Sequence, residues 1–312
     1  MTTPSAKTAF LFPGQGAQVV GMGRQFYDQS PAARAVLDQI DRALSRPLTK
    51  VMFEGPQDVL QQTVNAQPAI MAVSMACLEA MREKLGPLMP KPSFVAGHSL
   101  GEYTALAAAG VLGLEDTARL VQERGRLMQV ACDQRPGTMA AVLGLDEAAL
   151  LDVARETGTY VSNINTAEQT VISGDAAGVA KAMEAATARG ARKVIPLKVG
   201  GAFHSGLMEP ARLGLEQAVG RLAFHDATIP IVANCTGEPL TDAGAVKREL
   251  VAQITSCVQW KRSVERMADS GVTQFMEVGP GKALASMVKR IAKDALAVSV
   301  GDVESIAAFK PV

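Results

Sequence analysis

Residues 93–109 read SFVAGHSLGEYTALAAA, and this stretch decides the fold of the chain. Its first four residues predict a short strand, GHSLG predicts a glycine turn, and EYTALAAA predicts a helix that Gly110 ends. The same order of strand, glycine turn and helix recurs at residues 7–18 and again at residues 274–291. Alternating units of this kind predict a parallel sheet that is covered by helices.

The segment from about Cys132 to Val199 has a different pattern. We expect a strand at Thr138–Leu143, a helix at Glu147–Glu156, two strands around a turn at Asn163–Gln169, and then a helix and a last strand. This βαββαβ order is the split unit of a ferredoxin-like domain.

The chain therefore belongs to the α/β class. We predict a large, α/β-hydrolase-like domain with a parallel sheet, formed by residues 1–131 and 201–312. A small ferredoxin-like domain, residues 132–200, is inserted into it, and a cleft should separate the two parts.

Composition excludes several classes of protein. The 312 residues carry 31 basic and 31 acidic side chains, so a neutral chain of this kind is a poor candidate for binding nucleic acid or an anionic membrane. No run of 18 apolar residues predicts a membrane span, and the N-terminus lacks a signal peptide's pattern. Four widely spaced cysteines suggest neither zinc nor a disulfide framework, which favours a reducing cytoplasm.

The glycine turn Gly97–Gly101 matches the pattern G-x-S-x-G, which forms a nucleophile elbow when it joins a strand to a helix. Ser99 is then the candidate nucleophile. The N–H of Leu100, at the start of the helix, would face an oxyanion formed beside Ser99. The alternative is an ordinary tight turn that happens to contain a serine.

A serine nucleophile needs a base, and the chain has three histidines. His98 adjoins Ser99 in a turn that sends neighbouring side chains apart, so we expect it to brace the elbow. His225 precedes an apolar strand and is expected at the surface or the edge of the core. His204 lies in the glycine-flanked break VGGAFHSG, and it is the best candidate for the base.

Arg124 lies on an otherwise apolar stripe of the helix predicted from Glu115 to Ala131. A guanidinium on such a stripe cannot lose its proton and needs a partner. A bound carboxylate would meet its two parallel donors, and an internal Asp or Glu would serve equally well. Arg119 and Arg126 fall on other faces and should be solvated.

Two glycine-rich segments lack the residue patterns of phosphate-binding loops. The loop GQGAQ lacks the third glycine of a dinucleotide-binding fingerprint, and Gly281-Lys282 is followed by Ala283 where a phosphate loop has a hydroxyl residue. A main-chain N–H of Gln15 or of its neighbours, at a strand end near the elbow, could instead be the second oxyanion donor.

The motifs FPGQGAQ, GHSLGEY, QERGRLMQ, GAFHS, VQW and EVGPGK occur in this order from Phe12 to Arg290. As a set they resemble the malonyl-CoA:acyl carrier protein transacylase family. The resemblance implies that Ser99 becomes the malonyl ester, with His204 as its base and Arg124 as the partner of the malonyl carboxylate. It implies further roles for Gln15 and Leu100 as oxyanion donors, for Gln253 in orienting the histidine through an amide carbonyl, and for Asn165, Phe203 and His98 in contacting the substrate.

Phe203, in GAFHS, resembles the form of this motif that selects malonyl groups, since relatives that select methylmalonyl groups tend to carry serine there. The implied reaction is ping-pong transfer of a malonyl group from malonyl-CoA to the phosphopantetheine thiol of a holo acyl carrier protein, which feeds fatty acid elongation. We expect no cofactor and no metal, a monomer, and a cytoplasmic location. The alternatives are a discrete acyltransferase of a polyketide synthase or malonate decarboxylase, and a serine esterase or thioesterase.

Overall fold

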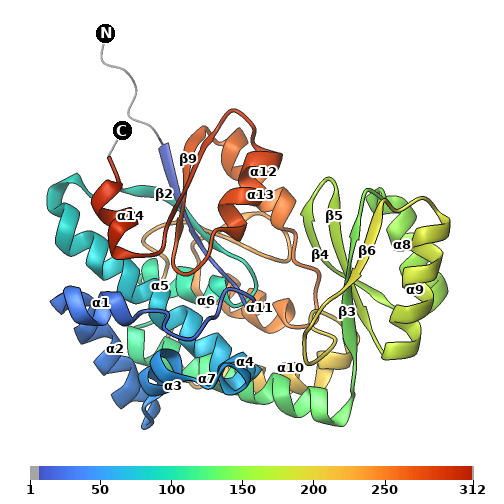
Figure 1. Ribbon diagram of the computed structural model, residues 1–312, viewed down its shortest axis with the longest axis horizontal. Coiled ribbons are helices and arrows are strands. Elements are labelled where there is room, and N and C mark those ends of the chain that lie inside the picture. Colours follow the sequence, from blue (N-terminus) through green and yellow to red (C-terminus); the bar gives the residue numbers. More distant parts are fainter. Residues whose placement is uncertain (1–6, 311–312) are drawn as a thin grey trace.

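The computed structural model describes residues 7–310. It has a larger part, built around a six-stranded sheet, and a smaller part at one side with a four-stranded sheet (Figure 1). The larger sheet has the strand order β10-β9-β1-β2-β7-β8. Its strands are β1 (Lys7–Phe12), β2 (Pro92–Gly97), β7 (Ile231–Val232), β8 (Pro239–Leu240), β9 (Val272–Val278) and β10 (Leu296–Val300).

Every neighbouring pair in this sheet is parallel except β7 and β8. The register pairs Phe12 with Gly97, so β1 and β2 end side by side and their following loops share one edge of the sheet. Loops at the carboxyl edge of a parallel sheet are the usual place for a ligand site. The predicted parallel sheet is confirmed, and it places the GQGAQ loop beside the Ser99 turn.

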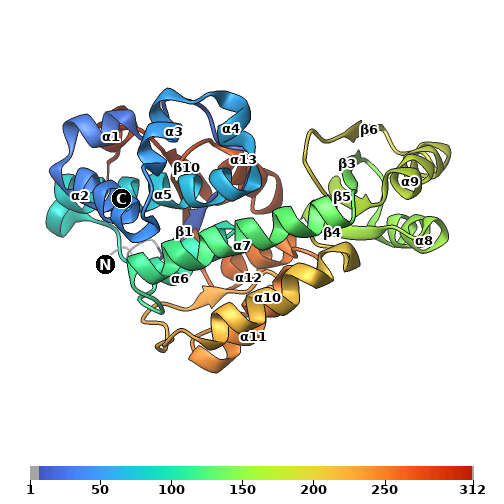
Figure 2. The same ribbon diagram turned by 90° about the horizontal axis from the view of Figure 1, so that it is seen from below.

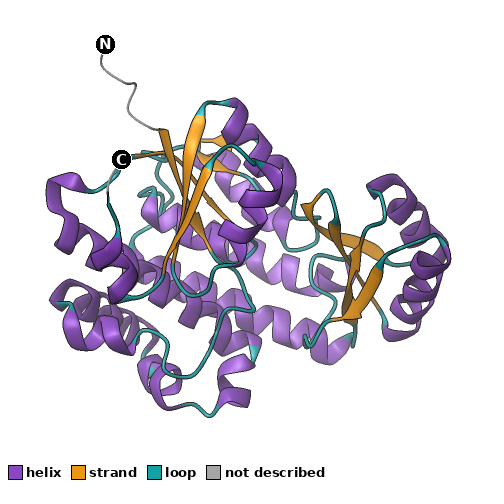
Figure 3. Cartoon of the chain, turned by 45° about the horizontal axis from the view of Figure 1, so that its top comes forward, coloured by secondary structure: helices purple, strands orange, loops and turns teal. Residues whose placement is uncertain are grey.

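Helices cover both faces of the larger sheet (Figure 3). The longest helix is α5 (Thr63–Leu85). It is hydrophobic around most of its circumference and mostly buried, as expected of a helix in the middle of a core. The helices of the larger part are α1 (Arg24–Gln29), α2 (Pro31–Leu44), α3 (Leu48–Glu54), α4 (Gln57–Gln61), α5 (Thr63–Leu85), α6 (Gly101–Ala108), α7 (Leu114–Gln134), α10 (Glu209–Gly220), α11 (Ala243–Gln253), α12 (Trp260–Asp269), α13 (Ala283–Ile291) and α14 (Val303–Ala308), with short 3₁₀ turns at Gly86–Leu88 and Gly206–Met208.

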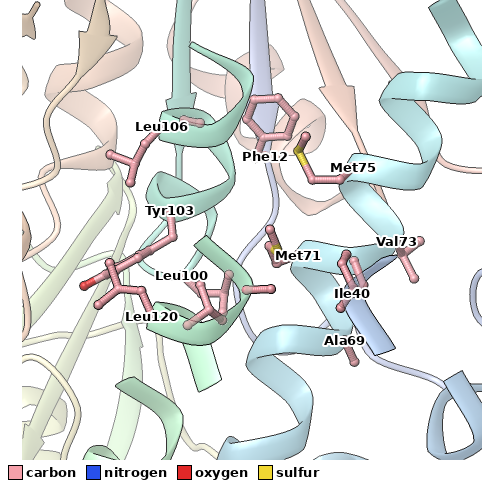
Figure 4. Packing of buried hydrophobic residues seen from close by; sticks show 14 of the residues in the cluster. Phe12, Ile40, Ala69, Met71, Val73, Met75, Leu100, Tyr103, Leu106 and Leu120 are labelled. Carbon is pink, nitrogen blue, oxygen red and sulfur yellow. The ribbon is translucent and has the colours of Figure 1, made fainter. Parts of the chain in front are cut away.

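The main core lies between α5, α6 and the end of β1. Figure 4 shows Met71 and Met75 of α5 facing Phe12, with Leu100 and Tyr103 on the α6 side. All five side chains are at most 6% exposed. This close-packed layer gives the turn between β2 and α6 a rigid support.

The smaller part contains β3 (Thr138–Leu143), α8 (Glu147–Thr157), β4 (Tyr160–Thr166), β5 (Gln169–Gly174), α9 (Ala176–Ala188) and β6 (Lys193–Pro196). Its sheet is antiparallel with the order β4-β5-β3-β6, so the predicted βαββαβ succession is present. Helices α8 and α9 cover its outer face (Figure 1). The predicted turn at Asn163–Gln169 is too long, because pairing continues to Thr166 and leaves only two residues between the strands.

Two connections join the parts. Helix α7 runs from the larger part toward β3 (Figure 2), and it continues through Gln134, so the boundary expected after residue 131 falls within its last turn. A short bridge also links β4 to the segment before α12, where the N–H of Ile164 donates to Val258 O at 2.9 Å and the N–H of Val258 donates to Ser162 O at 2.9 Å. The small sheet is thus tied to the larger part at a point close to the carboxyl edge.

Candidate active site

Ser99 stands at the turn between β2 and α6, and its backbone is left-handed, with φ of 53°. The flanking glycines permit this turn. A Cβ on Gly97 would lie 1.9 Å from the carbonyl carbon of Gly101, and a Cβ on Gly101 would lie 2.0 Å from Phe12 O. Any larger residue at either position would push the strand and the helix apart, so the close approach that exposes the Ser99 hydroxyl requires both glycines.

The main chain of Ser99 is held from both sides. Its N–H donates to Asn234 Oδ1 at 2.7 Å, and its carbonyl accepts from Gln253 Nε2 at 2.8 Å. A left-handed backbone costs a residue with a side chain on the order of 1–3 kcal/mol, and these two hydrogen bonds help to offset that cost. The strained conformation therefore depends on residues far away in the sequence.

His204 lies directly beside the nucleophile, with its Nε2 2.7 Å from Ser99 Oγ. Its Nδ1 is 2.9 Å from Gln253 O and 3.1 Å from Ser256 O. Because carbonyl oxygens only accept hydrogen bonds, Nδ1 carries the proton and Nε2 keeps the lone pair that faces Ser99. Gln253 thus meets the histidine through its main-chain carbonyl, whereas its side chain points to other partners.

Burial, together with the nearby positive charge of Arg124, lowers the pKa of His204 to about 3. The imidazole is therefore neutral across the physiological range and is able to accept a proton. Neither of the other two histidines bonds to Ser99 Oγ. His98 Nε2 is 2.9 Å from Asn165 Oδ1 and its ring lies against Trp260, while His225 is exposed in a loop, as expected.

Arg124 is 1% exposed and projects from α7 to the nucleophile, where its Nη2 donates to Ser99 Oγ at 3.1 Å. The same Nη2 donates to Gln253 Oε1 at 2.9 Å, and Nη1 donates to Gln67 Oε1 at 2.6 Å. Its Nε has no partner, and no carboxylate lies within ion-pair distance of it in the part of the chain that the structure describes. The internal Asp or Glu considered above is thus not observed as a direct partner, and the site holds a buried cation without an ion pair.

The stripe predicted on α7 is confirmed. Thr117, Leu120, Met128 and Ala131 are buried beside Arg124 on one side of the helix. On the other faces, the exposed Arg119 pairs with Glu115 and Asp116, and the exposed Arg126 pairs with Glu123.

Two residues that line the same cavity as Ser99 have main-chain N–H groups without an acceptor. Leu100 N and Gln15 N donate no hydrogen bond within residues 7–310. The Gln15 side chain accepts from Thr63 Oγ1 at 2.8 Å, which fixes the loop after β1. An oxyanion hole requires unpaired N–H groups of this kind.

The cavity has a volume of about 460 Å³ and lies between the two parts of the molecule. The larger part contributes the nucleophile and the arginine, and the smaller part contributes residues of β3, β4 and β5. The sequence-predicted residues that line it are Gln15, His98, Ser99, Leu100, Arg124, Asn165, Phe203 and His204, whereas Gln253 lies behind this surface and is fully buried.

The sequence did not point to three polar residues in this region. Gln67 on α5 holds Arg124, Asn234 after β7 holds the Ser99 N–H, and Glu102 on α6 contacts both Asn234 and Gln253. For Glu102 a signal existed, since it stands in GHSLGEY three residues after the serine, within the first turn of a helix that is otherwise buried. Gln67 precedes an apolar run and Asn234 follows one, and neither position gives a sign of its contacts.

Among residues 7–310, no group of three or more His, Cys, Asp or Glu side chains is arranged to hold a metal ion. Within the same range, every helix is too short or too polar to span a bilayer.

Nucleophile, neutral base, unpaired N–H groups and buried cation together suit acyl transfer. In such a reaction a serine attacks a carbonyl carbon and main-chain N–H groups receive the oxyanion, and a buried cation suits an acyl group that ends in a carboxylate.

Comparison with known proteins agrees with this chemistry. The model of the acyl transferase domain family matches residues 9–308. The malonyl CoA-acyl carrier protein transacylase of Bacillus subtilis is 42% identical over 306 residues, which cover 96% of this chain and 95% of the relative.

Solved structures give the same result. The acyl-carrier-protein S-malonyltransferase of Bartonella henselae superposes with a TM-score of 0.92 at 43% identity, over 97% of this chain and 98% of that one. A malonyl transacylase in complex with a type II polyketide acyl carrier protein superposes with a TM-score of 0.93 at 34% identity, over 97% and 98% of the two chains. The chain belongs to the malonyl CoA-acyl carrier protein transacylase family.

Proposed function

We propose that this acyltransferase moves a malonyl group from malonyl-CoA to the phosphopantetheine thiol of a holo acyl carrier protein, through an ester on Ser99. The observation that carries the proposal is the buried guanidinium of Arg124, which touches the Ser99 hydroxyl and has no acidic partner within the described residues. A malonyl group supplies that partner, because its free carboxylate lies close to the carbonyl that the serine attacks.

In the first half-reaction, His204 Nε2 takes the proton of Ser99 as the hydroxyl attacks the thioester carbonyl. The N–H groups of Gln15 and Leu100 receive the oxyanion. Collapse breaks the carbon–sulfur bond, and His204 returns the proton to the departing thiolate of coenzyme A. The malonyl carboxylate offsets the positive charge of Arg124, which raises the basicity of His204 once the substrate is bound.

The second half-reaction runs by the same path reversed. His204 takes the proton of the carrier's thiol, the sulfur attacks the Ser99 ester, and the serine recovers its proton. Each step uses only these side chains and the two thiol substrates, so the proposed transfer needs no cofactor and no metal.

Three further residues are proposed to shape the acyl site. Phe203 is 8% exposed, lines the cavity next to the base, and is proposed to exclude a methyl branch on the acyl chain. Asn165 and His98 bond to each other across the boundary between the two parts, and we propose that they contact the acyl or pantetheine portion of the substrate.

Fatty acid elongation is the pathway we propose, since the curated relative is named as a transacylase of malonyl CoA and acyl carrier protein. The alternative is transfer to the carrier protein of a polyketide synthase. One solved structural neighbour is a malonyl transacylase in complex with such a carrier protein. A malonate decarboxylase partner and the monomeric, cytoplasmic state remain predictions. So do the α/β-hydrolase-like description, which the Ser99 elbow supports, and the domain boundaries after residues 131 and 200.

Intact-protein mass spectrometry tests the proposal. The protein is mixed briefly with malonyl-CoA, acetyl-CoA or methylmalonyl-CoA, and a holo acyl carrier protein is then added. We expect rapid malonyl labelling at Ser99 that discharges onto the carrier. Loss of the label to water before the carrier arrives would favour a hydrolase, and transfer only to a polyketide carrier would favour the second pathway.

A further inference from the structure

A carboxylate is buried directly behind the nucleophile turn. Glu102, on the first turn of α6, is 1% exposed. Its Oε1 accepts from the N–H of Asn234 at 3.0 Å, and its Oε2 accepts from Gln253 Nε2 at 2.5 Å. Both oxygens of this side chain are therefore acceptors for fixed donors.

These two partners are the residues that hold Ser99. Asn234 accepts from the Ser99 N–H and donates through Nδ2 to Gly97 O at 2.7 Å, so it spans the turn. Gln253 donates to the Ser99 carbonyl with the same Nε2 that Glu102 accepts from. One carboxylate thus fixes the donors and acceptors on both sides of the left-handed residue.

Gln253 extends the arrangement to the other reacting groups. Its Oε1 accepts from Arg124 Nη2, and its main-chain carbonyl accepts from His204 Nδ1. The bond to Glu102 fixes which end of the Gln253 amide faces Arg124, because it requires the NH₂ end to face Glu102.

We infer that Glu102 is the positioning residue of the site, which holds Ser99, His204 and Arg124 in register through Asn234 and Gln253. The inference rests on the proposed function only for the identity of the acyl group. Glu102 itself touches neither the proposed substrate nor the Ser99 hydroxyl, so its effect passes through these two partners.

Burial at this position disfavours the charged form of the Glu102 carboxylate. Burial raises the pKa of Glu102 well above its ordinary value, and the neighbouring Glu249 raises it further. An apolar side chain would fill such a space at lower cost, so a buried acid that only supported the fold would have little advantage. The two accepted hydrogen bonds explain why an acceptor on both oxygens is needed here.

Glu102→Gln is the test, because it keeps the shape and adds a donor. The new NH₂ group must face either the Asn234 N–H or Gln253 Nε2, and Gln253 cannot turn its amide without losing Arg124. Asp41→Asn is the matched control. Asp41, on α2, also accepts on both carboxylate oxygens, from the N–H and the hydroxyl of Thr49, and no hydrogen bond within the described chain joins it to Ser99, Gln253 or Arg124.

Two readouts are compared for each folded variant. The first is the rate at which a fluorophosphonate labels Ser99, which needs no thioester and reports on the nucleophile alone. The second is the ratio of malonyl to acetyl labelling from the two coenzyme A thioesters, which reports on Arg124. We expect Glu102→Gln to slow fluorophosphonate labelling on the order of 10- to 100-fold. It should also lower the ratio of malonyl to acetyl labelling, while the KM for malonyl-CoA stays nearly unchanged. Asp41→Asn should label at nearly the wild-type rate.

Asn234→Ala provides a second route if Glu102→Gln does not fold. It should slow labelling in the same way, and the double variant should be little slower than the worse single variant, because both act on one turn. Wild-type labelling by any folded Glu102→Gln or Asn234→Ala protein would overturn the inference. So would equal slowing in the Glu102→Gln and Asp41→Asn variants with an unchanged acyl ratio. Failure of malonyl transfer in the wild type would refute the proposed function and leave the fluorophosphonate comparison intact.

Discussion

Replacing Arg124 by alanine should convert a malonyl-selective enzyme into one that no longer distinguishes malonyl from acetyl groups. The guanidinium is 1% exposed and presents Nη2 beside Ser99, so a malonyl carboxylate would meet it in a site shielded from water. Removing one partner of a buried, hydrogen-bonded charge pair costs about 2–5 kcal/mol. At 1.36 kcal/mol for each factor of ten, this is a loss of roughly 30- to 5,000-fold in kcat/KM for malonyl-CoA.

Acetyl-CoA has no carboxylate, so its transfer should be unchanged or faster. It carries no negative charge to compensate the buried cation, and in the wild type Arg124 also donates to the Ser99 hydroxyl. The assay is the initial rate of acyl-enzyme formation, quenched at short times and read by intact-protein mass spectrometry with each thioester in turn.

The matched control is Arg126→Ala, two residues further along α7. Arg126 pairs with Glu123 at the surface, and its side chain is 55% exposed, so its loss should affect neither rate. Arg124→Lys keeps the charge but loses the paired donors, and it should recover part of the malonyl rate. Equal losses for malonyl and acetyl transfer in Arg124→Ala would refute the reasoning, because they would make the residue structural.

Three further outcomes are expected. Ser99→Ala should form no acyl-enzyme, and His204→Ala should acylate far more slowly, while the double variant should be little worse than either; a malonylated Ser99→Ala protein in the mass spectrum would contradict the assignment. Phe203→Ser should raise methylmalonyl labelling relative to malonyl labelling, and an unchanged ratio would remove Phe203 from the acyl site. The pKa of His204 falls from 6.5 when unfolded to about 3 when folded, so the unfolded state binds the extra proton and stability is lost as pH falls. Denaturant unfolding of the wild type should therefore lose up to about 1.4 kcal/mol per pH unit between roughly pH 6 and 4 relative to His204→Asn, and parallel curves for the two proteins would show that His204 titrates normally.

The parts of the site that could be predicted are those determined by residues close together in the sequence. Gly97 and Gly101 bracket Ser99 at a spacing that only a tight strand-to-helix turn explains, and the apolar stripe around Arg124 showed a cation facing the core. The order of the small domain followed from its periodicity, with an error only at a turn that proved two residues long. These features depend on neighbours within one or two turns of the chain.

The parts that could not be predicted depend on contacts between distant segments. Asn234 is 135 residues from Ser99 and Glu102 is 151 residues from Gln253, and neither pair has any pattern that connects it. The partner of Arg124 was unpredictable for the same reason. The apolar pattern of its helix does not distinguish an internal Asp or Glu from a bound carboxylate as the partner of the guanidinium. Only the folded arrangement, with two glutamines and a serine around the guanidinium, separates these alternatives.

Backbone strain locates the same site without any motif. Three residues other than glycine have a left-handed backbone within residues 7–310, namely Ser45, Ser99 and His204. Ser45 caps the end of α2, where this conformation is common. The other two are the pair whose side chains lie 2.7 Å apart. Such strain persists only where the surroundings determine it, and here the main-chain bonds to Asn234 and Gln253 do so at Ser99. The strain, the arginine without an ion pair and the buried Glu102 therefore meet in one place, as expected where function rather than stability determines the local structure.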